Sequence, residues 1–440
     1  MTRLALDAPL PRLTLDALED ALLDPSTKGL RAGCGPITLR EVGERDWSLL
    51  REDLPLPQAV IRRATLEANS AWMSRFTEMN GLRIAPHGKT TMAPGLYDLQ
   101  ARDGAWAITV ATTQQMGVAL RFGVRRVLIA NQPVGPGQID AVFAALAGDP
   151  TVEIYCLADS VEGVALLANG AARWPASQAN KLRVLVEIGA DGGRTGARNR
   201  AAALAVSRAV AAASGLTLTG FECFEGVMPD IPAVDRLVDE VVAAAEAAEA
   251  EGLMPEGAPL ILSAGGSAYF DRVGERFVPA RFTRPVVKLL RSGCYLTHDA
   301  MSYARAFKRV VADTSLALPE GGLEPALEVW AYVQSRPEPG KAILTMGKRD
   351  VGHDAGLPKP ERWFRPGGAM AAPLPVPAAH EVVALNDQHC HMVTPADTAL
   401  KVGDMVGFGI GHPCTTFDKW ALLMIVDEEY RVTGAVRTFF

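Results

Sequence analysis

Several features that mark large classes of proteins are missing from this chain. No apolar run approaches the roughly 18 residues that a membrane-spanning helix needs. The first residues scatter acidic side chains where a secretory signal would carry a basic stretch followed by a continuous apolar run. We therefore expect a soluble, cytoplasmic protein with no membrane partner.

Cysteine is scarce and dispersed. Only six of the 440 residues are cysteine, and no two of them form a Cys-X-X-Cys pair. This pattern is typical of a reducing compartment, and it excludes a small domain held together by disulfide bonds. The six are Cys34, Cys156, Cys223, Cys294, Cys390 and Cys414.

A surplus of positive charge is also missing. Lys and Arg total 44 against 50 Asp and Glu, which gives a formal net charge of −6. Because a phosphate backbone is bound by a field of positive charge, nucleic acid is not expected as a partner. Apolar residues are abundant at 48%, and the length predicts two or three domains with a large buried core.

Between residues 82 and 295 one plan repeats: a short apolar run, a turn, and an Ala-rich amphipathic stretch. This alternation is typical of βαβ units. Eight strands fit a closed (β/α)8, or TIM, barrel better than an open sheet, and residues 200–214 and 234–251 are expected to form outer helices. The expected strands span residues 82–86, 106–110, 126–130, 152–157, 183–188, 216–221, 260–263 and 289–295.

After Ala300, Pro and Gly residues separate short strand-like runs, and no long stretch has the apolar spacing of a helix. This texture predicts a mostly β C-terminal domain, so the expected fold class is α/β, a (β/α)8 barrel plus a β domain. We expect the run at residues 36–42 to pair with the C-terminal domain. The assigned ranges are 1–30 for an N-terminal extension, 52–300 for the barrel, and 31–51 with 301–440 for the β domain.

In such a barrel the working side chains follow the C-terminal ends of the strands. Lys89 follows the first expected strand, and the Gly-Lys-Thr around it is no P-loop, because a P-loop needs glycine where Arg83 stands. A lysine at a barrel mouth can attack a carbonyl and form a Schiff base. A solvated surface lysine is the alternative interpretation.

Glycine-rich segments follow three later strands. Residues 189–196 (GADGGRTG) present the single arginine Arg194, while residues 263–267 read SAGGS and residues 292–295 read SGCY. Glycine lets backbone N–H groups approach an anion, which is how late barrel loops bind phosphate. Together with Lys89, these loops predict one cofactor across the barrel mouth, pyridoxal 5'-phosphate (PLP).

A second group of candidates lies near the C-terminus, where His412 and Cys414 are two residues apart. On an extended segment such a pair shares one face, so imidazole and thiolate could bind a zinc-like ion. Two protein ligands would leave open positions for water or substrate. The alternative is a pair of buried residues with no metal. A structural Cys2His2 site is disfavoured because the His-Cys-His run at 389–391 crowds its ligands.

Eight segments, in order, resemble the D-serine dehydratase and D-threonine aldolase group of fold-type III PLP enzymes, which also include alanine racemase. They are PHGKT, GADGGRTG, FECFEG (221–226), AGGS, RSGCY, DAGLP (354–358), NDQH and GHPCTTFDKW. The resemblance covers roughly residues 30–440. It implies an alanine-racemase-like barrel, a β C-terminal domain, and a homodimer with the active site at the interface.

The resemblance also implies roles for individual residues. Lys89 would be the Schiff-base lysine, with His87 beside it and Arg194 near the cofactor ring. His412 and Cys414 would hold a divalent metal, zinc in preference to manganese or magnesium, because a thiolate is a soft ligand. The other implied site residues are Gly265, Gly266, Ser267, Gly293 and Cys294 at the phosphate, Tyr295 beside it, and His389 on the substrate side of the pocket.

Three positions depart from the group. Ala85 stands where an arginine is usual, Met92 where a second lysine is common, and Phe224 where relatives tend to have tyrosine. The phenylalanine removes a hydroxyl from near the cofactor. We therefore expect substrate recognition to differ from that of the relatives.

The implied function is a PLP- and metal-dependent lyase whose small-molecule substrate is a β-hydroxy-D-amino acid. Cys414 favours a D-serine or D-threonine dehydratase, which releases a 2-oxo acid and ammonia, over an aldolase, which gives glycine and an aldehyde. An amino-acid racemase is another alternative, with Tyr295 or Tyr332 as its second acid-base group. A non-catalytic PLP-binding protein would need neither the C-terminal domain nor its metal pair.

Overall fold

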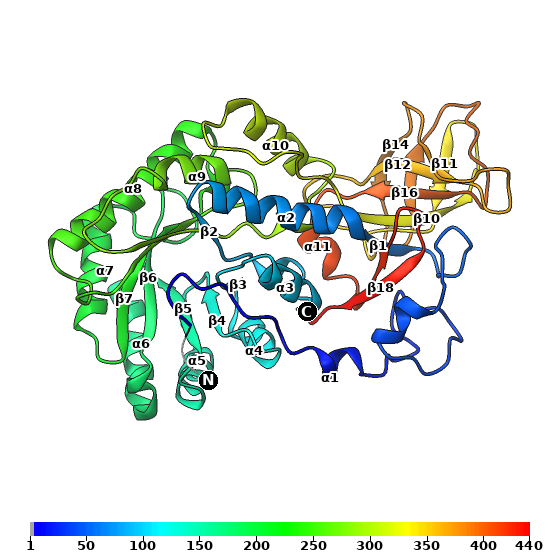
Figure 1. The fold of residues 1–440 in the computed structure, drawn as a ribbon. Coiled ribbons are helices and arrows are strands. Elements are labelled where there is room, and N and C mark those ends of the chain that lie inside the picture. Colours follow the sequence, from blue (N-terminus) through cyan, green and yellow to red (C-terminus); the bar gives the residue numbers. More distant parts are fainter. Residues whose placement is uncertain (1–3) are drawn as a thin grey trace.

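The computed structural model describes residues 4–440, which form two sheets of different kinds (Figure 1). Eight parallel strands form the first sheet, in the order β2-β9-β8-β7-β6-β5-β4-β3. Its two ends meet, because the N–H of Thr109 donates to the carbonyl of Pro86 and His87 forms a parallel bridge with Thr109. The strands are β2 (Arg83–Ile84), β3 (Ile108–Val110), β4 (Arg126–Ile129), β5 (Glu153–Ala158), β6 (Leu182–Ile188), β7 (Leu216–Cys223), β8 (Leu260–Ala264) and β9 (Val286–Leu290).

Amphipathic helices cover the outside of this barrel. In α7 (Arg200–Ala212), the buried positions Ala203, Val206 and Val210 recur at helical spacing and form the face that packs inward. Both helices expected from the sequence, at 200–214 and 234–251, are confirmed. The remaining helices of this part are α2 (Arg63–Met79), α3 (Pro94–Arg102), α4 (Thr113–Arg121), α5 (Pro136–Gly148), α6 (Val161–Arg173), α8 (Ile231–Ala250), α9 (Phe270–Phe277) and α10 (Ser302–Asp313).

The second sheet is mostly antiparallel and lies beside the barrel (Figure 1). Its main path runs β13-β12-β16-β10-β1-β17-β18, and β11, β15 and β14 extend it from β10. The predicted fold class, a barrel with a mostly β C-terminal domain, is confirmed. The strands are β1 (Gln58–Arg62), β10 (Leu327–Ser335), β11 (Lys341–Leu344), β12 (Lys359–Phe364), β13 (Leu374–Pro375), β14 (Glu381–Leu385), β15 (Cys390–Val393), β16 (Met405–Gly409), β17 (Leu422–Val426) and β18 (Val432–Arg437).

The β domain takes its central strand from the N-terminal part of the chain. β1 pairs antiparallel with β10 and parallel with β17, with Ile61 opposite Leu327 and Ile425. It lies inside the 52–300 range that the sequence assigned to the barrel, and its strand partners all belong to the β domain. The assigned domain ranges themselves stay predictions.

The expected strand at residues 36–42 is wrong. This segment makes one isolated bridge, between Leu22 and Thr38, and then enters a 3-10 helix, η1 (Arg40–Glu44). The carboxylate of Glu41 accepts hydrogen bonds from the N–H and the hydroxyl of Thr38, at 2.8 and 3.0 Å. This Thr-X-X-Glu arrangement is a capping box, which starts a helical turn in place of a strand.

The last expected barrel strand is shifted. It was predicted at residues 289–295, but β9 ends at Leu290, and Cys294–Leu296 form a 3-10 helix, η5. The intervening turn brings Gly293 against the segment between β2 and Lys89, where a Cβ atom would lie 2.6 Å from the carbonyl oxygen of His87. Glycine is therefore required at this point of the barrel mouth.

The start of the N-terminal extension, for which the sequence offered no role, runs along the other end of the barrel (Figure 1). Its first three residues lie outside the described part of the chain. The guanidinium of Arg126, only 1% exposed, donates to the carbonyls of Ala5 and Ala8 and pairs with Glu153 at 2.6 Å. The indole N–H of Trp106 donates to the carbonyl of Leu6. The extension thus satisfies buried donors at the N-terminal ends of the strands.

Within residues 4–440, the helices include none that is both long enough and apolar enough to cross a membrane.

We expect deletion of residues 1–9 to lower the free energy of unfolding by about 2–4 kcal/mol, because Arg126 and Trp106 lose buried acceptors. Urea unfolding of the full-length and shortened proteins measures the effect. Asp7→Asn, which changes only an exposed side chain of the same segment, serves as the control and should leave stability unchanged. Equal stability of the shortened protein would contradict this role of the extension.

Candidate active site

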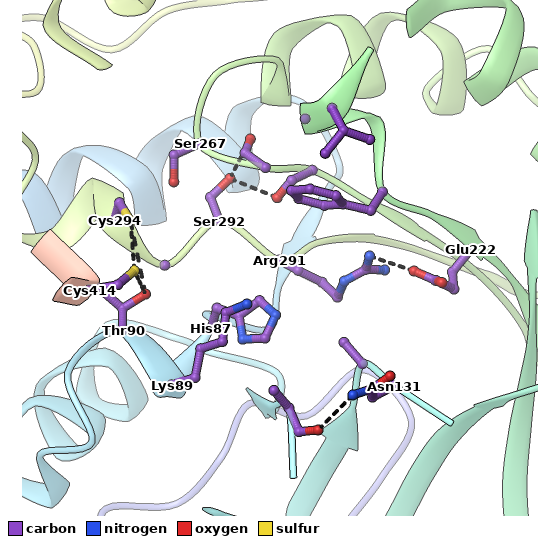
Figure 2. Close-up of a pocket in the computed structure, with 18 of the residues that line it drawn as sticks. His87, Lys89, Thr90, Asn131, Glu222, Ser267, Arg291, Ser292, Cys294 and Cys414 are labelled. Atoms are coloured by element: carbon purple, nitrogen blue, oxygen red, sulfur yellow. Dashed lines mark hydrogen bonds and ion pairs between the residues drawn. The ribbon is translucent and has the colours of Figure 1, made fainter. Parts of the chain in front are cut away.

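A cavity of about 530 Å3 lies at the C-terminal ends of the barrel strands (Figure 2). The C-terminal domain closes one side of it with a short helix, α11 (Pro413–Phe417). The structure brings ten of the twelve predicted site residues to its wall. They are His87, Lys89, Arg194, Gly265, Gly266, Ser267, Gly293, Cys294, His412 and Cys414.

The other two predicted residues lie elsewhere. Tyr295 is buried in the core, where its hydroxyl accepts a hydrogen bond from Gln100 at 3.3 Å. His389 is exposed on the turn between β14 and β15 and does not line the cavity. Tyr295 adjoins residues that do line the cavity, whereas the whole NDQH motif around His389 lies outside it.

Lys89 lies on a 3-10 turn, η2 (Gly88–Thr90), directly after β2. The hydroxyl of Tyr97 donates to the carbonyl of Gly88 at 2.8 Å and holds this turn in place. A Cβ at residue 88 would lie 2.7 Å from Ile108, so only glycine fits there. The lysine is thereby directed from a rigid turn into the cavity.

His87 is buried beside Lys89. Burial lowers its pKa well below the ordinary value, and the charges of Lys89 and Arg291 lower it further. Its Nδ1 atom has no hydrogen-bond partner among the described residues. The imidazole is therefore neutral, with a nitrogen left over for a group bound in the cavity.

A buried ion pair that the sequence analysis missed forms the floor of the cavity. The Glu222 carboxylate at the end of β7 lies 2.5 Å from the guanidinium of Arg291, which also donates to Ser263 and to the carbonyl of Cys223. Burial raises the pKa of Glu222 to about 8, against the opposing effect of Arg291. Glu222 lies in the FECFEG motif and Arg291 in the RSGCY motif. These two motifs are the sequence signal from which the ion pair could have been predicted.

The glycine loop after β8 is held by a carboxylate. Glu225 accepts hydrogen bonds from the backbone N–H groups of Gly265, at 3.0 Å, and Gly266, at 2.6 Å. Ser292 donates to the carbonyls of the same two glycines. Gly265 has a φ of +109°, which favours glycine. These two N–H groups are already engaged, so they are not free donors to an anion.

Arg194 reaches the cavity from the loop after β6. Its guanidinium lies 4.8 Å from the centre of the Phe224 ring, a cation–π contact. The phenylalanine that departs from the group's tyrosine therefore supports the arginine through its ring face.

His412 and Cys414 lie together at the start of α11. The Nδ1 atom of His412 is 2.6 Å from the carboxylate of Asp354, which also accepts from the hydroxyl of Thr415 at 2.6 Å. A carboxylate on one ring nitrogen fixes the imidazole and leaves its other nitrogen for a metal. Asp354 belongs to the DAGLP motif, and its role was not predicted.

The electrostatics of this pair favour an imidazolium and a thiolate. Hydrogen bonds from Cys294 and then from His412 lower the pKa of the Cys414 thiol, and the hydrogen bond to Cys414 raises the pKa of His412 to about 9. A thiolate and a histidine fixed by a carboxylate are suitable metal donors. Within residues 4–440, no group of three or more His, Cys, Asp or Glu is arranged to hold a metal ion. A metal here would therefore be bound at an open, two-residue site.

Comparison with known proteins identifies relatives of this chain. A family model described as "Putative serine dehydratase domain" matches residues 326–426. A 3-hydroxy-D-aspartate aldolase from Paracoccus denitrificans (strain Pd 1222) is 26% identical over 70% of this chain and 75% of its own. A D-threonine aldolase from Arthrobacter sp. is 24% identical over 84% of this chain and 89% of its own.

Solved structures share the fold. A D-threonine aldolase from Filomicrobium marinum superposes with a TM-score of 0.71 at 23% identity, covering 89% of this chain and 97% of that one. A D-threo-3-hydroxyaspartate dehydratase from Delftia sp. HT23 gives 0.68 at 19% identity, covering 89% and 99%. Structures of a D-threo-3-hydroxyaspartate dehydratase also include a histidine-to-alanine mutant and a cysteine-to-alanine mutant in the metal-free form.

The fold is therefore that of the alanine-racemase-like barrels, because an alanine racemase also superposes, with a TM-score of 0.57 over 88% of this chain. Within that class, the predicted resemblance to the D-serine dehydratase and D-threonine aldolase group is confirmed. The relatives, aldolases and dehydratases, are lyases, the enzyme class that the sequence predicts.

We expect Cys414 to be a thiolate at neutral pH in metal-free protein. An acid whose pKa is lowered loses its proton at lower pH, so the ultraviolet thiolate absorbance that distinguishes wild type from Cys414→Ser should persist from alkaline pH to below neutrality. Cys156→Ser is the matched control, because burial raises the pKa of Cys156 to about 12 and no difference is expected there at neutral pH. A midpoint for Cys414 near the ordinary thiol value would contradict the assignment.

Proposed function

We propose that this protein is a PLP- and divalent-metal-dependent lyase acting on β-hydroxy-D-amino acids, and that it is a dehydratase. One observation carries the proposal: His412 and Cys414, from the C-terminal domain, line the same cavity as Lys89 at the barrel mouth. A lysine and a metal pair on one cavity can act on adjacent atoms of one small substrate.

The residues present fit PLP. Lys89 would hold the cofactor aldehyde through its amine, and Arg194 would approach the ring. Since Gly265 and Gly266 donate to Glu225, the phosphate would be bound by Ser267 and by the backbone of Gly293 and Cys294. When bound, PLP supplies an electron sink for the bonds at the substrate α-carbon.

The residues also fit a metal. His412 offers the ring nitrogen that Asp354 leaves free, and Cys414 offers a thiolate, so that two protein ligands leave positions open for a substrate hydroxyl. A bound divalent ion would supply Lewis acidity at that hydroxyl. The soft thiolate favours zinc over manganese or magnesium.

The chain's own residues supply the acid-base chemistry. In the dehydratase reaction the Lys89 amine takes the α-proton. His87, held neutral by burial and by neighbouring cations, adds no positive charge next to the lysine. In an aldolase reaction the Lys89 amine would only need to exchange with the substrate amine. The substrate hydroxyl would have to lose its proton, and His389, which was expected on the substrate side of the pocket, lies outside the cavity.

The cysteine ligand supports dehydration over aldol cleavage. Of the structures of D-threo-3-hydroxyaspartate dehydratase, one carries a substitution at a histidine and another at a cysteine two positions later, and the cysteine mutant is described as metal-free. His412 and Cys414 have the same spacing. Aldol cleavage is the second candidate, because the aldolases named above are also relatives of this chain.

The two remaining alternatives have less support. Of the tyrosines considered for a racemase, Tyr295 is buried in the core, and Tyr332 donates to Glu52 at 2.7 Å outside the cavity. A passive PLP-binding protein would not require a metal pair on the cofactor cavity. The cytoplasmic location and the homodimer stay predictions of the sequence.

The deciding experiment is product identification with purified protein, PLP, zinc and D-threonine, repeated with 3-hydroxy-D-aspartate. A 2-oxo acid and ammonia are expected. Glycine and an aldehyde would instead establish aldol cleavage, and a change of configuration alone would establish a racemase.

We expect Cys414→Ala to lose metal-dependent turnover by at least about a hundredfold, because loss of a ligand weakens metal binding at least as much as loss of its supporting partners. Cofactor binding, followed by the visible absorbance of bound PLP, should be retained. Cys390→Ala changes another buried cysteine, on β15, and should keep both metal-dependent turnover and cofactor binding. Full turnover of Cys414→Ala would remove the metal from the mechanism.

A further inference from the structure

One thiol on the cavity has no part in the proposed chemistry. Cys294 was assigned to the phosphate through its place after Gly293, but its side chain points to the C-terminal domain (Figure 2). Its sulfur lies 3.6 Å from that of Cys414 and 3.9 Å from the Thr90 hydroxyl. The two sulfurs are in van der Waals contact, although the residues are 120 positions apart in the sequence.

The other cysteines occupy different elements. Cys156 and Cys223 are buried on β5 and β7, and Cys390 is buried on β15. Cys34 lies in the N-terminal segment and its sulfur contacts the carbonyl of Gly35. The close approach of two thiols is therefore a feature of the active-site cavity.

Small oxidants can reach this pair. Both Cys294 and Cys414 line the cavity of about 530 Å3, and Cys414 is partly exposed while Cys294 is buried. Hydrogen peroxide is little larger than water, and it would meet the Cys414 sulfur first, with the Cys294 sulfur already beside it.

We propose that Cys294 and Cys414 form a reversible disulfide when the metal-free protein meets a peroxide, and that this bond switches the metal site off. The loss of metal binding rests on the proposed function, in which the Cys414 sulfur is a ligand. The bond itself rests only on the position of the two thiols.

The chemistry balances with peroxide as the oxidant. The Cys414 sulfur attacks one peroxide oxygen, the O–O bond breaks, and a sulfenic acid and hydroxide form. The Cys294 sulfur then attacks the Cys414 sulfur and displaces the hydroxyl, which takes the Cys294 proton and leaves as water. The proton that the Cys414 thiol released converts the hydroxide of the first step to the second water. Two thiols lose two electrons, and one peroxide becomes two waters.

The bond would have two structural consequences. It would take the Cys414 sulfur away from the metal, since a disulfide sulfur is not a thiolate donor. It would also join η5 of the barrel to α11 of the β domain across the cavity mouth. A bound metal would protect the pair from oxidation, because a Cys414 sulfur coordinated to the metal is not free to attack the peroxide.

The test treats metal-free, full-length protein with a small excess of hydrogen peroxide and counts free thiols after unfolding. The protein is expected to lose two of its six cysteine thiols, with peptide mapping linking residues 294 and 414, and dithiothreitol should restore both. Protein loaded with zinc beforehand should keep all six. Six remaining thiols in the metal-free protein, or another linked pair, would overturn the proposal.

Two variants distinguish a disulfide partner from a bystander. In Cys294→Ser the same treatment should carry Cys414 on to sulfinic acid, which dithiothreitol does not reverse. Cys390→Ser, which removes a distant buried thiol, should behave as wild type. Sulfinic acid at Cys414 in the wild-type protein would show that Cys294 does not resolve the first oxidation product, against the proposal.

Zinc binding, measured by equilibrium dialysis with metal analysis, separates the switch from the proposed function. Oxidised wild type should bind zinc at least about tenfold more weakly than reduced protein. Equal binding by both forms would overturn the switch. If reduced protein binds no zinc while the linked peptide forms, the metal site of the proposed function fails and the disulfide stands.

Discussion

The pairing of β1 with β10 on one side and β17 on the other is the contact on which the active site depends. The middle of β1 is fully buried, and the strand leads directly through α2 into the barrel. β17 follows α11 in the chain and pairs with β1, and β1 leads into the barrel. The pairing of β1 with β17 therefore sets where α11 lies relative to the barrel. This is why Cys414 lies against η2, the turn that carries Lys89, with its sulfur 3.4 Å from the Thr90 hydroxyl.

Several ionisable side chains are buried around the cavity. Glu222 lies 2.5 Å from Arg291 beneath it, and Arg291 also donates to Ser263 and to a backbone carbonyl. Glu225 stabilises the glycine loop after β8, because its carboxylate accepts hydrogen bonds from two backbone N–H groups of that loop. Lys89 and Arg194 are further cations on the wall of the cavity, and Glu187 is a further carboxylate there.

The sequence predicts the barrel well because short apolar runs that alternate with amphipathic stretches have few other ways to bury their apolar faces. It fails where local capping competes with strand formation, as at Thr38 and Glu41, and where a turn is needed for packing, as after Leu290. The N-terminal extension shows the same limit. Nothing in its sequence indicates that Arg126 and Trp106 need its carbonyl groups.

The sequence alone determined the barrel and the β domain, and it predicted ten of the residues that line the cavity, because these follow from hydrophobic period and from short motifs at strand ends. Only the tertiary structure decided which motif residues face the cavity: His412 and Cys414 do, and His389 and Tyr295 do not. It also brought the sulfur of Cys294 to that of Cys414. Spacing along a chain sets the face on which a side chain lies, whereas contact between distant segments is decided by how the two domains pack together.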